Sequence, residues 1–250
     1  MILQKSSLLY AAFLIMAAIA AAAAGYHAHR EALLLRTDPD LIPANRSLLQ
    51  FALSRGAASF QASCAGCHGA SGQGDRTRGI PDLTDDDWLF GTGSVSEIER
   101  VVAYGIRSYN PKSWNLARMP GFARARPSDT DPKILPLSPG DIRDVVEYLV
   151  SLQKGSADPA AASRGAQIYN GVGGCFDCHS LDGRGDSAIG APDLADKVTL
   201  YGDGGREALI DSVANGRQGI CPAWINRLNP ATIREIALYV YMLSHNARVD

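Results

Sequence analysis

The chain has 250 residues and a formal net charge of −2, with 24 lysines and arginines against 26 aspartates and glutamates. This near balance gives no indication of a nucleic-acid-binding surface. The length allows a membrane segment followed by two small domains of about 100 residues each. The five cysteines are an incomplete set for disulfide pairing.

The first predicted element is an apolar segment at residues 7–25. As a helix it would span roughly 28 Å, close to the hydrocarbon thickness of a bilayer. Lys5 precedes the segment and small residues from Ala20 to Ala24 end it, so it fits either a membrane anchor or a cleaved signal peptide. We assign residues 1–30 to the membrane segment.

Two copies of Cys-x-x-Cys-His follow, and this spacing is typical of covalent attachment of a c-type haem. The two thiols bond to the haem vinyl groups, and the histidine is the proximal ligand of the iron. A zinc knuckle or a redox dithiol would need further Cys or His pairs or a βαβ pattern, and neither surrounds the motifs. The sequence therefore predicts two covalently bound haems c, held by Cys64, Cys67 and His68 and by Cys175, Cys178 and His179.

Covalent haem of this kind also predicts the compartment. It is normally attached outside the bacterial cytoplasmic membrane, which puts the residues after Gly25 in the periplasm. The charges beside the apolar segment do not decide the orientation, because Arg30 and Arg36 follow it and Lys5 precedes it. We therefore expect a single-pass protein of the bacterial inner membrane with its haem domains in the periplasm.

The two haem motifs belong to an internal repeat. At an offset of 111 residues, Gly79-Ile80-Pro81-Asp82-Leu83 aligns with Gly190-Ala191-Pro192-Asp193-Leu194. The offset shortens further on, as expected for a tandem duplication whose loops have changed in length. The predicted units are a first domain at 31–153, a linker at 154–162 and a second domain at 163–250.

Each repeat begins and ends with a predicted helix. The first helix carries a Gly-x-x-x-aromatic pattern just before its haem motif, and the last begins at a cap followed by proline. The glycine allows the last helix to cross closely. This contact between first and last helices resembles the class I cytochromes c, which implies a mainly α fold: an N-terminal transmembrane helix and two tandem class I cytochrome c domains. The pattern residues are Gly56 and Phe60, Gly165 and Tyr169, Ser138 and Pro139, and Asn229 and Pro230.

The sixth ligand of each haem is expected on the loop before the last helix of its repeat. Met119 has this position in the first repeat, where its thioether would favour reduced iron, although methionine is also a common core residue. Cys221 has the matching position in the second repeat, and a thiolate there would lower the potential strongly. Cys221 could instead be a small packing residue, with Met242 or His245 as the alternative ligand.

Longer stretches resemble one specific family. Residues 81–91, which read Pro-Asp-Leu-Thr-Asp-Asp-Asp-Trp-Leu-Phe-Gly, and residues 219–224 around Cys221 are similar to the dihaem subunit of cbb3-type cytochrome c oxidases, called CcoP or FixP. The resemblance runs from about residue 44 to residue 244. The family has methionine at the position of Cys221, so the second distal ligand does not carry over, whereas the other seven haem-binding residues do.

This resemblance implies a function and partners. It implies an uncleaved anchor in the lipid bilayer, and electron transfer from a soluble or membrane-bound cytochrome c donor through both haems. The acceptor would be the oxygen-reducing catalytic subunit, in a complex that also contains a monohaem subunit. No catalysis is expected from this chain alone. Two alternatives use Cys221: a dihaem redox enzyme of the thiosulfate dehydrogenase type, and a haem-based sensor or regulatory subunit.

Overall fold

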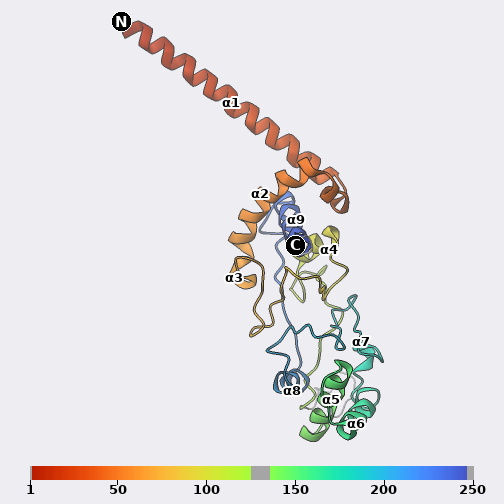
Figure 1. Cartoon of the computed structure of the whole chain (residues 1–250). Helices are drawn as coiled ribbons and strands as arrows, with labels where there is room; N and C mark the ends of the chain where they lie inside the picture. The colour runs from red at the N-terminus through yellow and green to blue at the C-terminus, as the bar shows by residue number, and fades with distance from the viewer. Residues whose placement is uncertain (1, 125–135, 247–250) are drawn as a thin grey trace.

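The computed structural model describes residues 2–124 and 136–246 of the chain (Figure 1). Within these ranges the chain is mainly helical and has no β-sheet, only isolated bridges between single residues. The prediction of a mainly α fold is therefore confirmed. The helices are α1 (Ile2–Arg36), the 3-10 helix η1 (Pro39–Ala44), α2 (Arg46–Ser63), α3 (Ala65–His68), α4 (Val95–Tyr104), α5 (Pro139–Leu152), α6 (Pro159–Tyr169), α7 (Phe176–His179), α8 (Arg206–Asn215) and α9 (Pro230–Asn246).

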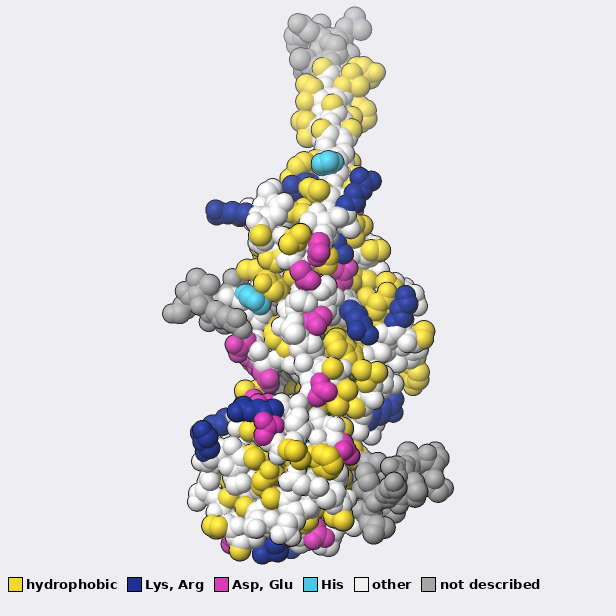
Figure 2. All heavy atoms as spheres, turned by 90° about the vertical axis from the view of Figure 1, so that its right-hand side faces the viewer, with side chains coloured by type: hydrophobic (Ala, Val, Ile, Leu, Met, Phe, Trp, Pro, Cys, Tyr) yellow, Lys and Arg dark blue, Asp and Glu magenta, His cyan; other side chains and the backbone are white. Residues whose placement is uncertain are grey.

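Helix α1 projects from the rest of the molecule as a single long rod (Figure 1). Its part from Tyr10 to Arg36 is long and apolar enough to cross a membrane. Hydrophobic side chains cover the projecting part (Figure 2), and Phe13 and Met16 are among the exposed ones. Only the end of α1 joins the body, where Leu34 is fully buried.

The part of the body next to α1 consists of α2, α3, α4 and α9, and we call it the anchor-side unit (Figure 1). Its core forms where α2 and α4 pack against α9. Arg234 of α9 fixes the end of α1, because its guanidinium donates hydrogen bonds to the carbonyl oxygens of Leu34 and Thr37, each at 2.8 Å. The same side chain forms an ion pair with Glu99 at 2.9 Å. The membrane helix is thus joined to this unit through largely buried polar contacts.

The remaining helices, α5 to α8, form a second core at the opposite end of the body, which we call the far unit (Figure 1). Helix α5 packs against α6 and α8. The buried residues at these contacts are Ile142, Val145, Val146, Leu149, Tyr169 and Val213.

The two units therefore exchange their closing helices. The sequence predicts that α2 is crossed by α5 of its own repeat, but α2 is crossed by α9, and α6 is crossed by α5. The glycine contacts have the expected form: a methyl group on Gly56 would overlap the Glu235 carbonyl, and one on Gly165 would overlap the Asp144 carbonyl. The division at the 154–162 linker follows the order of the repeats along the chain, whereas each packed unit contains helices from both.

The repeats also meet in an approximately symmetric interface. The Gly91 N–H donates to the Ser187 carbonyl at 3.1 Å, and the Gly202 N–H donates to the Arg76 carbonyl at 2.9 Å. One aromatic ring from each repeat accompanies these bonds: Phe90 lies against Gly190, and Tyr201 lies against Gly79. Side chains at both glycines would collide with these rings.

Candidate haem sites

Each Cys-x-x-Cys-His motif forms one helical turn. In the first motif, Cys64 caps the end of α2 and its carbonyl accepts the His68 N–H at 3.0 Å. In the second motif, the Cys175 carbonyl accepts the His179 N–H, also at 3.0 Å. Residues three and four apart share one face of a helix, so each turn presents the second cysteine and the histidine beside the first cysteine. This is the arrangement that attachment to one haem requires.

Both histidines are held by a proline carbonyl oxygen. The Nδ1 atom of His68 lies 3.3 Å from the Pro81 oxygen, and Nδ1 of His179 lies 3.1 Å from the Pro192 oxygen. Since a carbonyl only accepts, Nδ1 must donate, and Nε2 keeps the lone pair that binds a metal. Burial lowers the pKa of both histidines, which favours the neutral, ligating form. Pro81 and Pro192 are equivalent in the internal repeat, but the sequence alone did not predict this role for them.

A glycine in each loop brings the proline carbonyl close to the histidine. Gly74 has φ +68°, and its N–H donates to the His68 carbonyl at 2.9 Å. A methyl group here would overlap the Pro81 carbonyl. Gly185 is its equivalent, with φ +73° and an N–H that donates to the His179 carbonyl at 3.0 Å. Only glycine fits these positions, because there is no room for a Cβ atom and the backbone is in the left-handed region.

Cys221 faces the first haem motif. Its backbone pairs with Ile106, just beyond the end of α4, through reciprocal N–H to carbonyl bonds of 3.0 Å. Burial, together with the nearby Cys64 and Cys67, raises the pKa of the Cys221 thiol to about 11. The thiol is therefore neutral at pH 7 without a metal, and binding to iron would supply the positive charge that stabilises a thiolate.

Met119 faces the second motif. It packs on the core of the far unit together with Tyr169 and Cys175. Its carbonyl accepts the Arg217 N–H at 3.3 Å, just beyond the end of α8, in the same way as Cys221 pairs beyond α4. The structure thus brings Cys221 to the first motif and Met119 to the second, which is the reverse of the pairing expected from sequence order.

The reversal has a simple cause in the chain course. The segment that carries Met119 leads into α5, and α5 belongs to the far unit. The segment that carries Cys221 leads into α9, which belongs to the anchor-side unit. Each sulfur residue follows its closing helix to the other motif, so the exchange of helices also exchanges the candidate ligands.

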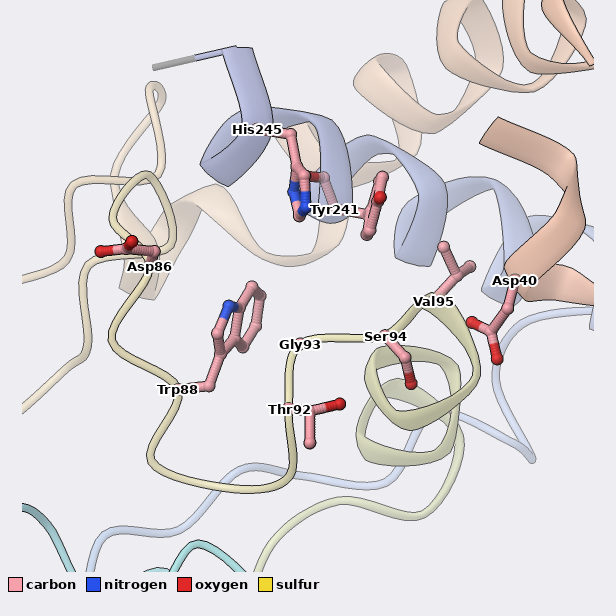
Figure 3. A pocket seen from close by; sticks show the side chains of 9 residues that line it. All are labelled: Asp40, Asp86, Trp88, Thr92, Gly93, Ser94, Val95, Tyr241 and His245. Carbon is pink, nitrogen blue, oxygen red and sulfur yellow. The ribbon is translucent and has the colours of Figure 1, made fainter. Parts of the chain in front are cut away.

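The alternative ligand His245 has other contacts. Its Nδ1 atom lies 2.8 Å from the Tyr241 carbonyl, and its ring stacks on the Tyr241 ring with 3.8 Å between centroids. Both side chains line an open pocket with Trp88 and Asp40, which Figure 3 shows from close by. None of the eight predicted haem-binding residues lines this pocket. His245 is therefore placed apart from the two distal segments.

The described residues fit two haems of the c type. Each unit provides a Cys-x-x-Cys-His turn, a histidine whose Nε2 keeps its lone pair, and one further sulfur-bearing residue near the cysteines of the motif. Within the ranges it describes, the structure shows no group of three or more His, Cys, Asp or Glu side chains that could hold a metal ion on their own.

Comparison with known proteins gives the same interpretation. Residues 53–153 match the model of the cytochrome c family, and residues 160–240 match that of cbb3-type cytochrome c oxidase subunit III. A FixP subunit from Sinorhizobium medicae is 34% identical over 225 residues, covering 90% of this chain and 72% of the relative. A CcoP subunit from Cereibacter sphaeroides is 37% identical over 210 residues, covering 84% and 67%. A FixP subunit from Rhizobium meliloti is 35% identical over 202 residues, covering 81% and 64%.

Proposed function

Because the chain belongs to the CcoP/FixP family of cbb3-type cytochrome c oxidase subunits, we propose that it relays electrons to the oxygen-reducing subunit of such a complex. It is a membrane-anchored electron-transfer protein with two covalently bound haems c. The observation that supports the relay most directly is the presence of two complete haem-binding turns in one chain, each with a sulfur-bearing residue close to its cysteines. The family relation favours this function over a thiosulfate dehydrogenase.

The exchanged geometry leads to a specific ligand assignment. We assign His68 and Cys221 to the haem attached at Cys64 and Cys67, and His179 and Met119 to the other haem. Each haem supplies a one-electron redox centre when bound. The protein sets the potential: the Met119 thioether favours the reduced form, and the Cys221 thiolate favours the oxidised form. The far unit would then have the higher potential.

The position of α1 supports a direction of transfer. The anchor-side unit adjoins the membrane helix, whereas the far unit lies at the opposite end of the body (Figure 1). A soluble or membrane-bound cytochrome c donor in the periplasm would reach the far unit first. Electrons would then pass to the anchor-side unit and on to the catalytic and monohaem subunits of the complex. The step from the His/Met haem to the His/Cys haem would run uphill in energy.

Membrane attachment follows from the same geometry. The exposed apolar surface of α1 would lie in the lipid bilayer of the bacterial inner membrane. The body would stand on the periplasmic side, where covalent haem is attached. Glu31 and Arg55 form an ion pair of 2.7 Å at the base of α1, and Arg55 also contacts Glu235 of α9 at 2.7 Å. These contacts would hold the body in a fixed orientation above the bilayer.

The test is a spectroelectrochemical titration of the full-length chain in detergent, with low-spin ferric resonance spectra recorded at each potential. We expect one haem with a high potential and a His/Met spectrum, and one haem with a much lower potential and the spectrum of a thiolate ligand. Two similar high-potential haems would contradict the assignment of Cys221. Oxygen consumption by membranes that carry the complex with and without this chain tests the relay itself, and unchanged consumption with a cytochrome c donor would contradict it.

A further inference from the structure

Arg107 occupies an unusual position between the two distal segments. It follows α4 and has φ +49°, in the left-handed region that residues with a side chain seldom adopt. Its N–H donates to the Trp114 carbonyl at 3.1 Å, and the preceding residue, Ile106, pairs with Cys221. The backbone around Arg107 is therefore fixed on both sides, which determines where its side chain begins.

The guanidinium of Arg107 contacts both distal segments at once. Its Nε donates to the Ala117 carbonyl at 3.0 Å, and its Nη1 donates to the Gly219 carbonyl at 3.0 Å. Ala117 lies two residues before Met119, and Gly219 lies two residues before Cys221. Since the guanidinium is planar and rigid, the two bonds fix the separation of the two segments.

The aromatic interface supports the same side chain. The guanidinium carbon lies 5.5 Å from the centroid of the Phe90 ring, and that ring lies against Gly190 of the second repeat. Burial lowers the pKa of Arg107, but arginine keeps its charge in proteins. A cation over an aromatic face gains attraction, which favours one rotamer of the side chain.

The second repeat has no arginine at the position equivalent to Arg107. Gly105 and Gly216 are equivalent, since each follows the corresponding helix and has φ near +75°, at +77° and +73°. The residue equivalent to Arg107 is therefore Gln218, which is exposed. A glutamine lacks the five-donor fork of arginine. A single side chain from the first repeat thus serves the distal segments of both units.

We propose that Arg107 is a positioning residue shared by both haem sites, which holds the Met119 and Cys221 segments at a fixed separation and couples the two distal ligands. This inference rests on the proposed function and its ligand assignment. Loss of the guanidinium frees both segments together, so both sulfur ligands dissociate more often. Dissociation at one haem also loosens the segment that serves the other.

The experiment measures carbon monoxide binding to the reduced, full-length protein with both haems in place. Carbon monoxide can bind only when the distal ligand has left the iron, so its binding rate reports the open fraction of each haem. We expect Arg107→Gln to raise this rate at both haems by about tenfold, the effect of losing one charge-assisted hydrogen bond at each segment. Arg107→Lys keeps the charge without the fork and should give a smaller rise at both haems.

Arg118→Gln is the matched control. Arg118 precedes Met119, is exposed, and its Nε lies 3.3 Å from Asn115 Oδ1, so its loss removes the same charge without a bridge between the segments. We expect this variant to leave both rates unchanged. A rise at only one haem in Arg107→Gln, or at neither, overturns the proposal. If Arg107→Gln does not take up both haems, the Arg107→Lys rates decide by the same criterion.

Two further variants separate this inference from the ligand assignment. Met119→Ala and Cys221→Ala should each open one haem completely, at the second and the first motif respectively. If they do so while Arg107→Gln has no effect, only the shared positioning role fails. If neither variant changes carbon monoxide binding, the assignment fails, and the role of Arg107 fails with it.

Discussion

The anchor-side unit and the far unit support the haem-binding histidine in the same way, but they differ in the distal residue that would set the haem potential. Both hold a histidine against a proline carbonyl, at 3.3 Å in the first and 3.1 Å in the second, and both cross their helices at a glycine. The distal segment presents Cys221 in one and Met119 in the other. A duplicated domain can therefore keep its haem-attachment geometry in both copies, while a change of one distal side chain makes the two haem potentials differ.

The units also differ in how well the ion pairs between their helices are shielded from solvent. The anchor-side unit binds the end of α1 through Arg234, which is 12% exposed, and its partner Glu99. In the far unit, Arg164 pairs with Asp144 at 2.6 Å but is 59% exposed. Water and salt weaken an exposed pair much more than a shielded one. The Arg234–Glu99 pair should therefore contribute more to stability than the Arg164–Asp144 pair.

The largest expected effect comes from making the two distal residues alike. Cys221→Met should raise the potential of the haem attached at Cys64 and Cys67 by a few hundred millivolts, within the span of about 0.8 V that axial ligands cover. The other haem should change little. Spectroelectrochemical titration with resonance spectra measures both. The reciprocal variant Met119→Cys should lower the potential of the other haem. If each variant instead changed the haem of its own repeat, Met119 would belong to the first motif and Cys221 to the second.

The next effect concerns the connection to the membrane helix. Arg234→Gln should destabilise the anchor-side unit by about 3 kcal/mol, because it leaves Glu99 and the carbonyls at the end of α1 without their shielded partner. Arg164→Gln should have a much smaller effect on the far unit, because its ion pair is exposed to solvent. Hydrogen exchange along the end of α1 measures the difference. Equal protection in both variants would argue against a special connection.

A smaller effect is expected at the helix crossings. Gly165→Ala should destabilise the far unit by about 2 kcal/mol, because the new methyl group overlaps the Asp144 carbonyl. Gly56→Ala should have a similar effect on the anchor-side unit through Glu235. Gly140→Ala, which meets nothing closer than 3.5 Å, is the control and should be neutral or slightly stabilising. Urea unfolding followed at each haem shows which unit is affected, and no loss at either crossing would contradict the close packing.

Much of this fold could be predicted from residue patterns. The capping residue Ser138 does accept the Asp141 N–H at the start of α5, and the aromatic residues at both crossings meet, with Phe60 on Tyr239 at 5.2 Å and Tyr148 on Tyr169 at 5.1 Å. Local patterns of this kind depend on neighbours in the chain or on a few complementary surfaces. They define each helix and its buried face.

Which closing helix crosses which first helix could not be predicted, because the local patterns are the same in both repeats. Helices α5 and α9 carry matching stripes, with Ile142 and Tyr148 equivalent to Ile233 and Tyr239, so either helix fits the glycine of either repeat. Similarity between the repeats hides the exchange, and with it the true neighbours of Met119 and Cys221. Arg107 gave no signal either, because the second repeat has glutamine at the equivalent position.

The smallest expected effect lies where acidic side chains of the two repeats approach each other. Figure 2 shows acidic side chains at the narrowing between the two units. Partial burial, together with the charges of Asp196, Asp85 and Asp193, raises the pKa of Asp87 from 3.8 to about 6. A carboxyl group that binds its proton more tightly when folded destabilises the fold as pH rises from 3.8 to 6. Since Asp87 is exposed, the loss should stay below about 1 kcal/mol.

Asp87→Asn removes this charge and tests whether the ionised carboxylate lowers the stability of the fold. The variant and the parent chain should unfold alike below pH 3.8, and the variant should be the more stable one above pH 6. Asp75 provides the opposite case, because hydrogen bonds from Thr77 lower its pKa. Asp75→Asn should therefore remove stability that is present above its usual pKa and lost on acidification. Urea unfolding at several pH values measures both. A loss of stability above pH 6 in Asp87→Asn would contradict the repulsion between this carboxylate and the acidic side chains of the second repeat.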